Sequence, residues 1–206
     1  MDSDNKPTKI SDLLFTAAKK WPEQPAISFR GRTQNWLETK NRCHAAATIL
    51  QRAGVKSGDR VAFLGLNSNV CFESYYSPAI LGATMVPINY RLAFREMVEC
   101  VQDCAPTVLI VDENYLTEAR QLQEGCDSVK TLIACGDNTA PDGMLSYEQH
   151  INEVIRTNVY CEISPSVDDE TVITFYTGGT TGRSKGVMLS NNNFQCNTLR
   201  SIPLYR

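Results

Sequence analysis

The residues with the clearest chemical potential form one glycine-rich segment near the end of the chain. TFYTGGTTGRSKGVMLS, residues 174–190, holds four glycines, four threonines and two cations in seventeen positions. Glycines let the backbone approach a ligand closely, and successive N–H groups in such a turn can bind an anion. The segment therefore predicts a polyphosphate-binding loop at the end of a strand, where α/β proteins hold ligands.

The expected phosphate donors combine backbone amides, hydroxyls and one mobile positive charge. They are Thr177, Gly178, Gly179, Thr180, Thr181, Gly182 and Lys185. The order excludes a Walker A loop, because Ser184 precedes Lys185 and Gly186 follows it. No GxGxxG opens a dinucleotide fold either. From composition alone, a hairpin or surface loop with glycines for turning stays open as the alternative.

Charge distribution supports a small anionic ligand. No acidic residue occurs from Thr171 to Arg206, although the chain as a whole has a net charge of −3. That acidic balance argues against nucleic acid as the main partner. A locally cationic strand–loop–helix on an acidic protein suits a small anion better than a polyanion.

The eight cysteines do not suggest a disulfide framework, since they are scattered and contain no CxxC pair. Cys100 and Cys104 are close enough on a predicted helix for a metal pair, but His44 and His150 offer no ligand spacing. We expect reduced, structural thiols, and neither histidine is expected to be catalytic. The polar start and the lack of an apolar run of about 20 residues predict a cytoplasmic protein without a membrane span.

A strand–helix rhythm runs through the chain and must position the loop. It predicts an α/β fold with a mostly parallel sheet flanked by helices on both faces. Ser11 is the expected cap of the first helix, and residues 25–36 are expected to form a hairpin. The expected strands are residues 58–66, 84–90, 106–112, 129–135 and 171–177, and helices include residues 69–83, 94–104, 113–125 and 146–156.

YTGGTTGRSKGVMLS resembles the phosphate-binding signature of the adenylate-forming superfamily, Tyr-Thr-Ser-Gly-Thr-Thr-Gly-x-Pro-Lys-Gly-Val. GVKSGDRVAFLGLNS, ILGATMVPINYRL and PTVLIVDE resemble earlier core motifs of that family, so the likeness spans residues 11–200. Three positions depart from the usual pattern. Gly178 replaces Ser, Ser184 replaces Pro, and Asn191 stands where many members have His.

The resemblance implies an ATP-dependent acyl-CoA synthetase. A carboxylate attacks the α-phosphorus of MgATP to give an acyl-adenylate and pyrophosphate, and a thiol, usually coenzyme A, then displaces AMP. The seven loop donors would hold the departing phosphates, with Lys185 as the catalytic counter-charge. The Glu that ligates Mg²⁺ is expected outside this chain. Arg183 is expected to be solvated.

The resemblance also implies an incomplete enzyme. Residues 1–206 correspond to the N-terminal part of the large AMP-binding domain, without the small C-terminal domain, so this chain alone is expected to be inactive. The alternatives are a non-catalytic nucleotide-binding or interaction module and a peptide-synthetase adenylation domain, although PINYRL favours acyl- and aryl-CoA ligases. A peroxisomal signal would lie beyond residue 206. The acid substrate and oligomeric state stay open.

Two further groups attract attention but are expected to be structural. Phe72, Tyr75 and Tyr76 lie on an apolar predicted helix and are expected in the core. Asn89 and Arg91 follow a strand end, where a role in loop structure is favoured over one in the cleft.

Overall fold

The computed structural model describes residues 9–136, 140–165, 170–178 and 184–201. Within these residues the helices are α1 (Ile10–Lys20), α2 (Trp36–Arg52), α3 (Asn69–Ile80), α4 (Phe94–Cys104), α5 (Leu116–Gly125), α6 (Tyr147–Thr157) and α7 (Asn191–Ser201), with a 3₁₀ turn η1 (Glu113–Tyr115). The strands are β1 (Pro25–Phe29), β2 (Arg32–Asn35), β3 (Arg60–Leu64), β4 (Thr84–Ile88), β5 (Val108–Asp112), β6 (Thr131–Cys135), β7 (Leu145–Ser146), β8 (Thr171–Thr177) and β9 (Lys185–Ser190).

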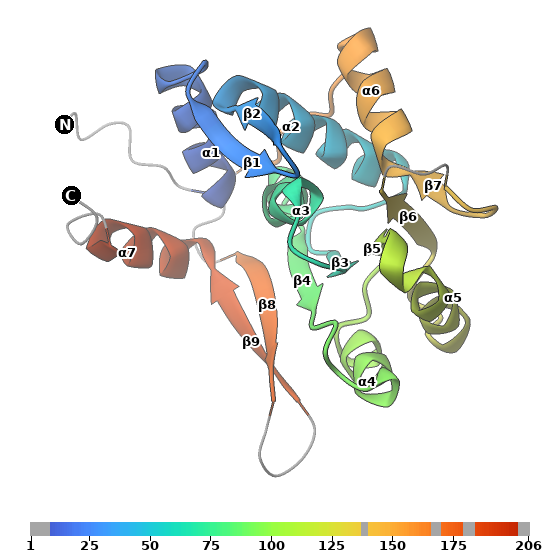
Figure 1. Ribbon diagram of the computed structural model, residues 1–206. Coiled ribbons are helices and arrows are strands. Elements are labelled where there is room, and N and C mark those ends of the chain that lie inside the picture. The colour runs from blue at the N-terminus through green and yellow to red at the C-terminus, as the bar shows by residue number, and fades with distance from the viewer. Residues whose placement is uncertain (1–8, 137–139, 166–169, 179–183, 202–206) are drawn as a thin grey trace.

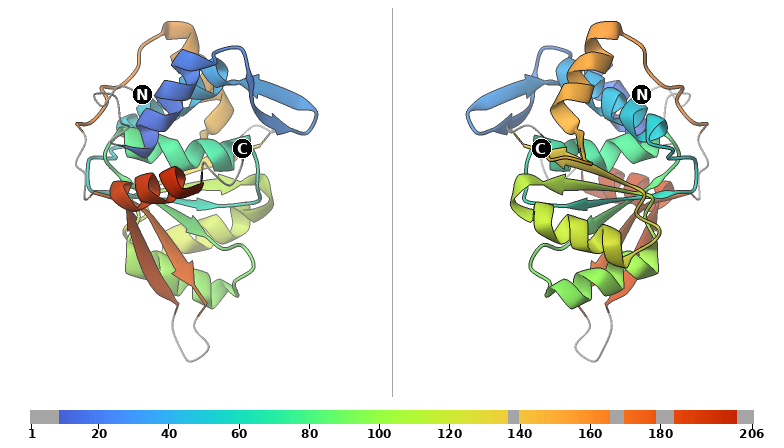
Figure 2. Two further views of the ribbon diagram at one scale, coloured as in Figure 1. Left: turned by 90° about the vertical axis from the view of Figure 1, so that its left-hand side faces the viewer. Right: turned by 90° about the vertical axis from the view of Figure 1, so that its right-hand side faces the viewer.

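The predicted α/β architecture is confirmed. Strands pair in the order β7-β6-β5-β3-β4-β8-β9, all parallel except β9, which is antiparallel to β8. The predicted hairpin is the separate β1–β2 pair. Helices α1, α2, α3 and α6 cover one face of the large sheet, and α4 and α5 cover the other (Figures 1 and 2). The sheet is therefore the middle layer of three.

Alternation along the strands builds a core on each face. In β3, Val61 and Phe63 join the core under α1, α2, α3 and α6, whereas Ala62 and Leu64 join the core under α4 and α5. Successive side chains of a strand point to opposite faces, so a strand buried on both sides reads as an unbroken apolar run. This is the reason that RVAFL and VLIVD were recognisable in the sequence.

The start of α1 differs from its prediction. The cap residue is Lys9, and Ser11 lies buried within the first turn. Two side chains accept hydrogen bonds from the free backbone N–H groups at the start of the helix. Asp12 Oδ2 accepts the Lys9 N–H at 2.9 Å, and Asn191 Oδ1 accepts the Ile10 N–H at 3.0 Å. Sequence-local capping rules could not find Asn191, because it lies 181 residues away.

The segment after the glycine-rich loop is also corrected. The sequence suggested strand–loop–helix, but the loop joins two antiparallel strands, β8 and β9, and α7 begins only at Asn191. Pairing with β8 gives the backbone of Val187, Met188 and Leu189 hydrogen-bonding partners that a helix start would not offer. The hairpin extends beyond the edge of the sheet (Figure 1).

None of the helices in the described part of the chain is long and apolar enough to cross a membrane. All eight cysteines carry free thiols: six are buried, Cys71 is half-buried and Cys196 is exposed.

Candidate functional site

The mouth of the glycine-rich loop is formed by three described residues. Thr177 ends β8, Gly178 follows it, and Lys185 begins β9. Thr177 and Lys185 are register partners, and the Thr177 hydroxyl donates to the Lys185 carbonyl at 3.4 Å. All three residues are exposed. The remaining predicted donors, Gly179, Thr180, Thr181 and Gly182, lie outside the described residues.

The two glycines at the mouth, Gly178 and Gly186, serve different structural purposes. A Cβ on Gly178 would meet nothing within 4 Å, so its surroundings are open to a ligand. A Cβ on Gly186 would lie 3.0 Å from Thr174 Cγ2 and 3.4 Å from the Tyr176 ring. Gly186 therefore permits the close packing of the Tyr176 ring across the hairpin, whereas Gly178 leaves space.

Helix α4 contacts the hairpin next to the loop. The Tyr176 hydroxyl donates to Asp103 Oδ2 at 2.5 Å. Burial, and then the hydrogen bond to Asp103, raise the pKa of Tyr176. Burial, and then the negative charges of Asp103, Glu96 and Glu99, raise the pKa of Cys100 to about 11. Both residues are thus neutral at physiological pH, and Tyr176 contacts Asp103 through an ordinary hydrogen bond.

The contact with Asp103 places the loop mouth beside α4. Tyr176 reaches the last turn of α4, next to Cys104, whose carbonyl accepts from Arg60 at the start of β3. The mouth consequently lies beside the C-terminal half of α4, and it follows the carboxyl end of β8, which runs parallel to β4. Figure 2 shows the hairpin bending past the sheet toward α4. The strong twist of a two-stranded ribbon makes such bending favourable.

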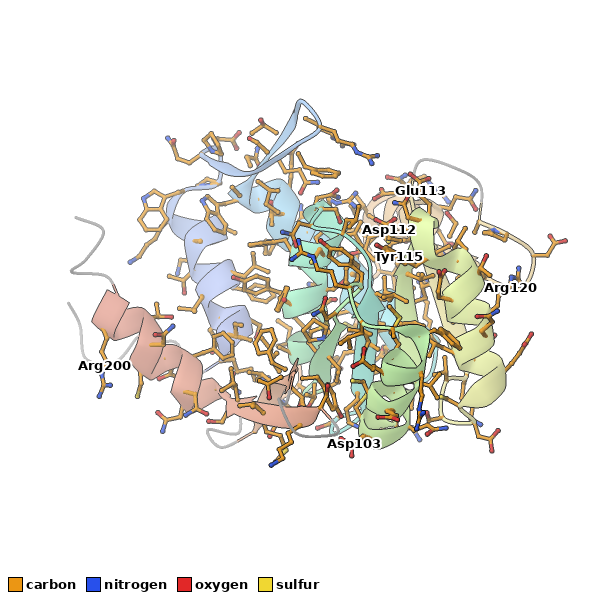
Figure 3. The ribbon with its side chains drawn as sticks, turned by 60° about the horizontal axis from the view of Figure 1, so that its bottom comes forward. Asp103, Asp112, Glu113, Tyr115, Arg120 and Arg200 are labelled. Atoms are coloured by element: carbon orange, nitrogen blue, oxygen red, sulfur yellow. The ribbon has the colours of Figure 1, made fainter. Side chains whose placement is uncertain are left out.

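A second polar cluster lies beside β5, an interior strand of the sheet. Asp112, Glu113 and Tyr115 lie together at the carboxyl end of β5, well separated from Asp103 (Figure 3). With Arg30 and Glu148 the two acids line a cavity of about 70 Å³, room for only a few water molecules. Asp112 Oδ1 accepts the Asn114 N–H at 2.9 Å.

Residues that the sequence left open have structural partners. His44 stacks on Tyr160 with ring centroids 4.7 Å apart, and its Nε2 lies 2.9 Å from the Cys161 carbonyl. His150 Nδ1 lies 2.7 Å from the carbonyl of Ser146, one turn earlier.

The aromatic residues of α3 and the polar pair after β4 lie at the surface or close to it. Phe72, Tyr75 and Tyr76 are half-buried, and the last two pack against the core cluster under α1–α3. Asn89 and Arg91 are exposed, and Asn89 Oδ1 accepts the Arg91 N–H at 3.0 Å as part of a turn.

In the part of the chain that the structure describes, no three His, Cys, Asp or Glu side chains lie close enough together to hold a metal ion. Asp103, the carboxylate placed against the hairpin, already accepts a hydrogen bond from Tyr176. The described residues therefore do not form a Mg²⁺ site of their own.

Comparison with known proteins identifies the family. The sequence matches the family model for AMP-binding enzymes over residues 14–205. The chain belongs to the AMP-binding enzyme family. An indoleacetate–CoA ligase of Aromatoleum aromaticum is 31% identical over 96% of this chain and 38% of its own length. A fatty acid–[acyl-carrier-protein] ligase, ScoC, of Streptomyces coeruleorubidus is 28% identical over 91% of this chain and 34% of its own.

Solved structures agree with this AMP-binding fold. ATP-bound MatB from Rhodopseudomonas palustris superposes with a TM-score of 0.77 at 24% identity, covering 96% of this chain and 38% of that chain. At that level of identity the likeness concerns the fold alone. The chain spans little more than a third of the length of these relatives. The adenylate-forming resemblance and the fold expected from it are thus confirmed.

Proposed function

We propose that this chain supplies the phosphate-binding part of an ATP-dependent acid–thiol ligase. The observation that supports it is the pairing of Thr177 with Lys185 across the mouth of a glycine-rich loop. This pairing brings a hydroxyl, an open glycine and a positive charge to one exposed place in a family of AMP-binding enzymes. Residues 1–206 would form the N-terminal part of the large domain.

The chemistry assigned to these residues is electrostatic. As a carboxylate attacks the α-phosphorus of ATP, negative charge builds on the departing β- and γ-phosphates. Lys185 would balance that charge, and the Thr177 hydroxyl and loop amides, including those of Gly178 and of Gly179, Thr180, Thr181 and Gly182, would donate to phosphate oxygens. Mg²⁺, where bound, would neutralise further phosphate charge. Its ligands would come from outside the described residues.

Coenzyme A is the proposed acceptor of the acyl group, and a carboxylic acid is the substrate. The indoleacetate–CoA ligase relative supports this choice by its name. The ScoC relative is named for an acyl-carrier protein, which keeps a carrier-bound thiol as the second candidate acceptor. A cytoplasmic location fits both acceptors.

Binding of polyphosphate by the 206-residue chain tests the proposal directly. We expect isothermal titration with inorganic tripolyphosphate to show binding that weakens about tenfold in Lys185→Ala, since a charge-assisted contact is worth about 1.5–3 kcal/mol. Lys130→Ala removes an exposed lysine beyond α5 and should leave the affinity unchanged. Undetectable binding by the wild-type chain, or equal losses in both variants, would contradict the proposal.

Turnover provides a separate measurement. We expect ATP–pyrophosphate exchange by the purified chain to stay at the level of the blank, because the chain covers only 38% of its indoleacetate–CoA ligase relative. Exchange well above the blank would show that residues 1–206 suffice for adenylation. It would then overturn the assignment of this chain to part of the catalytic domain.

A further inference from the structure

We propose that helix α1 is a strap that holds the hairpin–helix unit, formed by β8, β9 and α7, against the rest of the fold, with Asn191 as the residue that fastens it. The first turn of α1 lies directly beside the start of α7 (Figure 1). The inference does not depend on phosphate binding, although the strapped unit carries Thr177 and Lys185.

Asn191 connects three segments that include both ends of the described chain. Its Oδ1 atom accepts the Ile10 N–H at 3.0 Å, and its own N–H donates to the Glu170 carbonyl, directly before β8, at 3.1 Å. Asn191 is 1% exposed, so water has little access to replace these partners, and a buried backbone N–H that loses its acceptor is costly. One residue therefore fastens the start of α1 to the starts of β8 and α7.

The two asparagines that follow Asn191 make only local contacts. Asn192 and Asn193 are exposed. Asn193 Oδ1 accepts the Ser190 N–H at 2.9 Å, and Asn192 Oδ1 accepts from the Cys196 sulfur at 3.6 Å. The contact of Asn191 instead spans 181 residues. Asn192 is therefore a matched control for Asn191.

A second contact fastens α1 to the segment that leads into β8. Lys9 is 2% exposed, and its ammonium group donates to the Ser164 carbonyl. The Ser164 N–H in turn donates to the Ile80 carbonyl at the end of α3, at 2.8 Å. Phe194 of α7 packs against the core cluster that contains Ile10. Polar and apolar contacts with the unit thus meet at the first turn of α1.

The strap matters because the unit makes few hydrogen bonds to the rest of the sheet. Strand β8 pairs with β4 at one register position, Met85 with Ile173, and the Thr84 hydroxyl donates to the Thr171 carbonyl at 2.8 Å. Strand β9 pairs with β8 alone among the described strands, and Met188 is 71% exposed. The unit is therefore expected to open while β3 to β6 stay paired, and the contacts with α1 set how rarely it does so.

Two variants remove the contact from opposite sides. Asn191→Ala removes the acceptor, and Ile10→Pro removes the donor. Proline fits this position, because Ile10 is the first residue of α1 and Lys9 before it is extended, with φ −129° and ψ 158°. The controls are Asn192→Ala, which keeps Asn191, and Ile10→Ala, which shortens the side chain but keeps the N–H.

Amide hydrogen exchange of the folded chain reports the opening of each region separately. In the wild type we expect the amides of β9 and α7 to exchange faster than those of β3, because the unit opens alone. In Asn191→Ala and Ile10→Pro they should exchange about tenfold faster than in the matched controls. The double variant should exchange no faster than either single variant, since both changes break the same hydrogen bond.

Two results would overturn the strap. Unchanged exchange of β9 and α7 in both variants would show that these elements open with the contact to α1 intact. Equal exchange of α7 and β3 in the wild type would show that the unit opens only with the whole fold. Tripolyphosphate takes no part in the measurement, so a failure of the proposed function would leave this inference standing.

Discussion

Arg42 and Glu73 form a buried ion pair between α2 and α3, with Arg42 Nε 2.6 Å from Glu73 Oε1. The two side chains are 7% and 0% exposed. Glu73 Oε2 also accepts the Tyr147 hydroxyl at 2.8 Å, and Arg42 reaches Glu148 on α6. The pair therefore connects three of the helices that cover one face of the sheet.

Removing Arg42 should destabilise the fold strongly, because Glu73 would remain as a buried charge without its counter-ion. We expect Arg42→Met to lower the free energy of unfolding by about 3–5 kcal/mol, measured by urea denaturation. Arg52→Met breaks the exposed pair with Glu153, whose side chains are 43% and 48% exposed, and should cost less than about 1 kcal/mol. Equal losses in the two variants would show that Glu73 is satisfied without Arg42.

His44 should make stability fall as the solution becomes acidic. Burial lowers the pKa of His44 below its ordinary value of 6.5, more than the hydrogen bond to the Cys161 carbonyl raises it. The unfolded chain then takes up the proton more readily than the folded one, so the contribution is present above pH 6.5 and is lost as pH falls below that value. The free energy of unfolding should be measured at about pH 7.5 and about pH 5.5, on either side of the ordinary histidine pKa. Between these two values it should change less in His44→Gln than in the wild type.

Two glycine-to-alanine substitutions should have opposite effects on the stability of the fold. A Cβ on Gly65 would lie 2.5 Å from the Asp112 Cβ, so Gly65→Ala must displace β3 or β5 and should cost about 1–3 kcal/mol. Gly125, at the end of α5, has nothing within 4 Å of its Cβ position. Gly125→Ala should be neutral or stabilise by up to about 1 kcal/mol. Thermal unfolding of the two variants checks the comparison.

Thiol labelling should distinguish Cys196 from the other cysteines. Cys196 is exposed on α7, whereas six cysteines are buried, and burial raises the pKa of Cys104 to about 12. We expect an aromatic disulfide reagent to modify one thiol per folded chain rapidly at neutral pH. Cys196→Ser should abolish that phase, and a second rapid thiol in the variant would identify Cys71, which is half-buried.

The sheet was predictable from the sequence because burial on both faces leaves continuous apolar runs such as VLIVD, which are bounded by turn residues. The prediction of a phosphate-binding loop had a similarly local basis, since donors and glycines are concentrated within residues 174–190. The assignments of Thr177, Gly178 and Lys185 to phosphate remain predictions.

Long-range partners were not predictable. Nothing near Ser11 indicates that Asn191 accepts the Ile10 N–H, and nothing in the glycine-rich segment indicates Asp103. The helix over residues 94–104 was expected, and Cys100 was noticed only as a weak metal candidate. The contact of Asp103 with Tyr176 depends on how the hairpin bends, which is a property of the tertiary structure.

The strand order has a consequence for the sequence of folding events. Strands β3 to β7 join through local crossovers, but β8 must find β4 across 87 residues, where the Thr84 hydroxyl donates to the Thr171 carbonyl at 2.8 Å. Because loop-closure entropy delays distant pairings, β8 should dock last, after the rest of the sheet has condensed. In pulse-labelling during refolding, amides of β3 and β5 should gain protection before those of β8. The β8–β9 hairpin, which we propose to bind phosphate, would then join a sheet that has already formed.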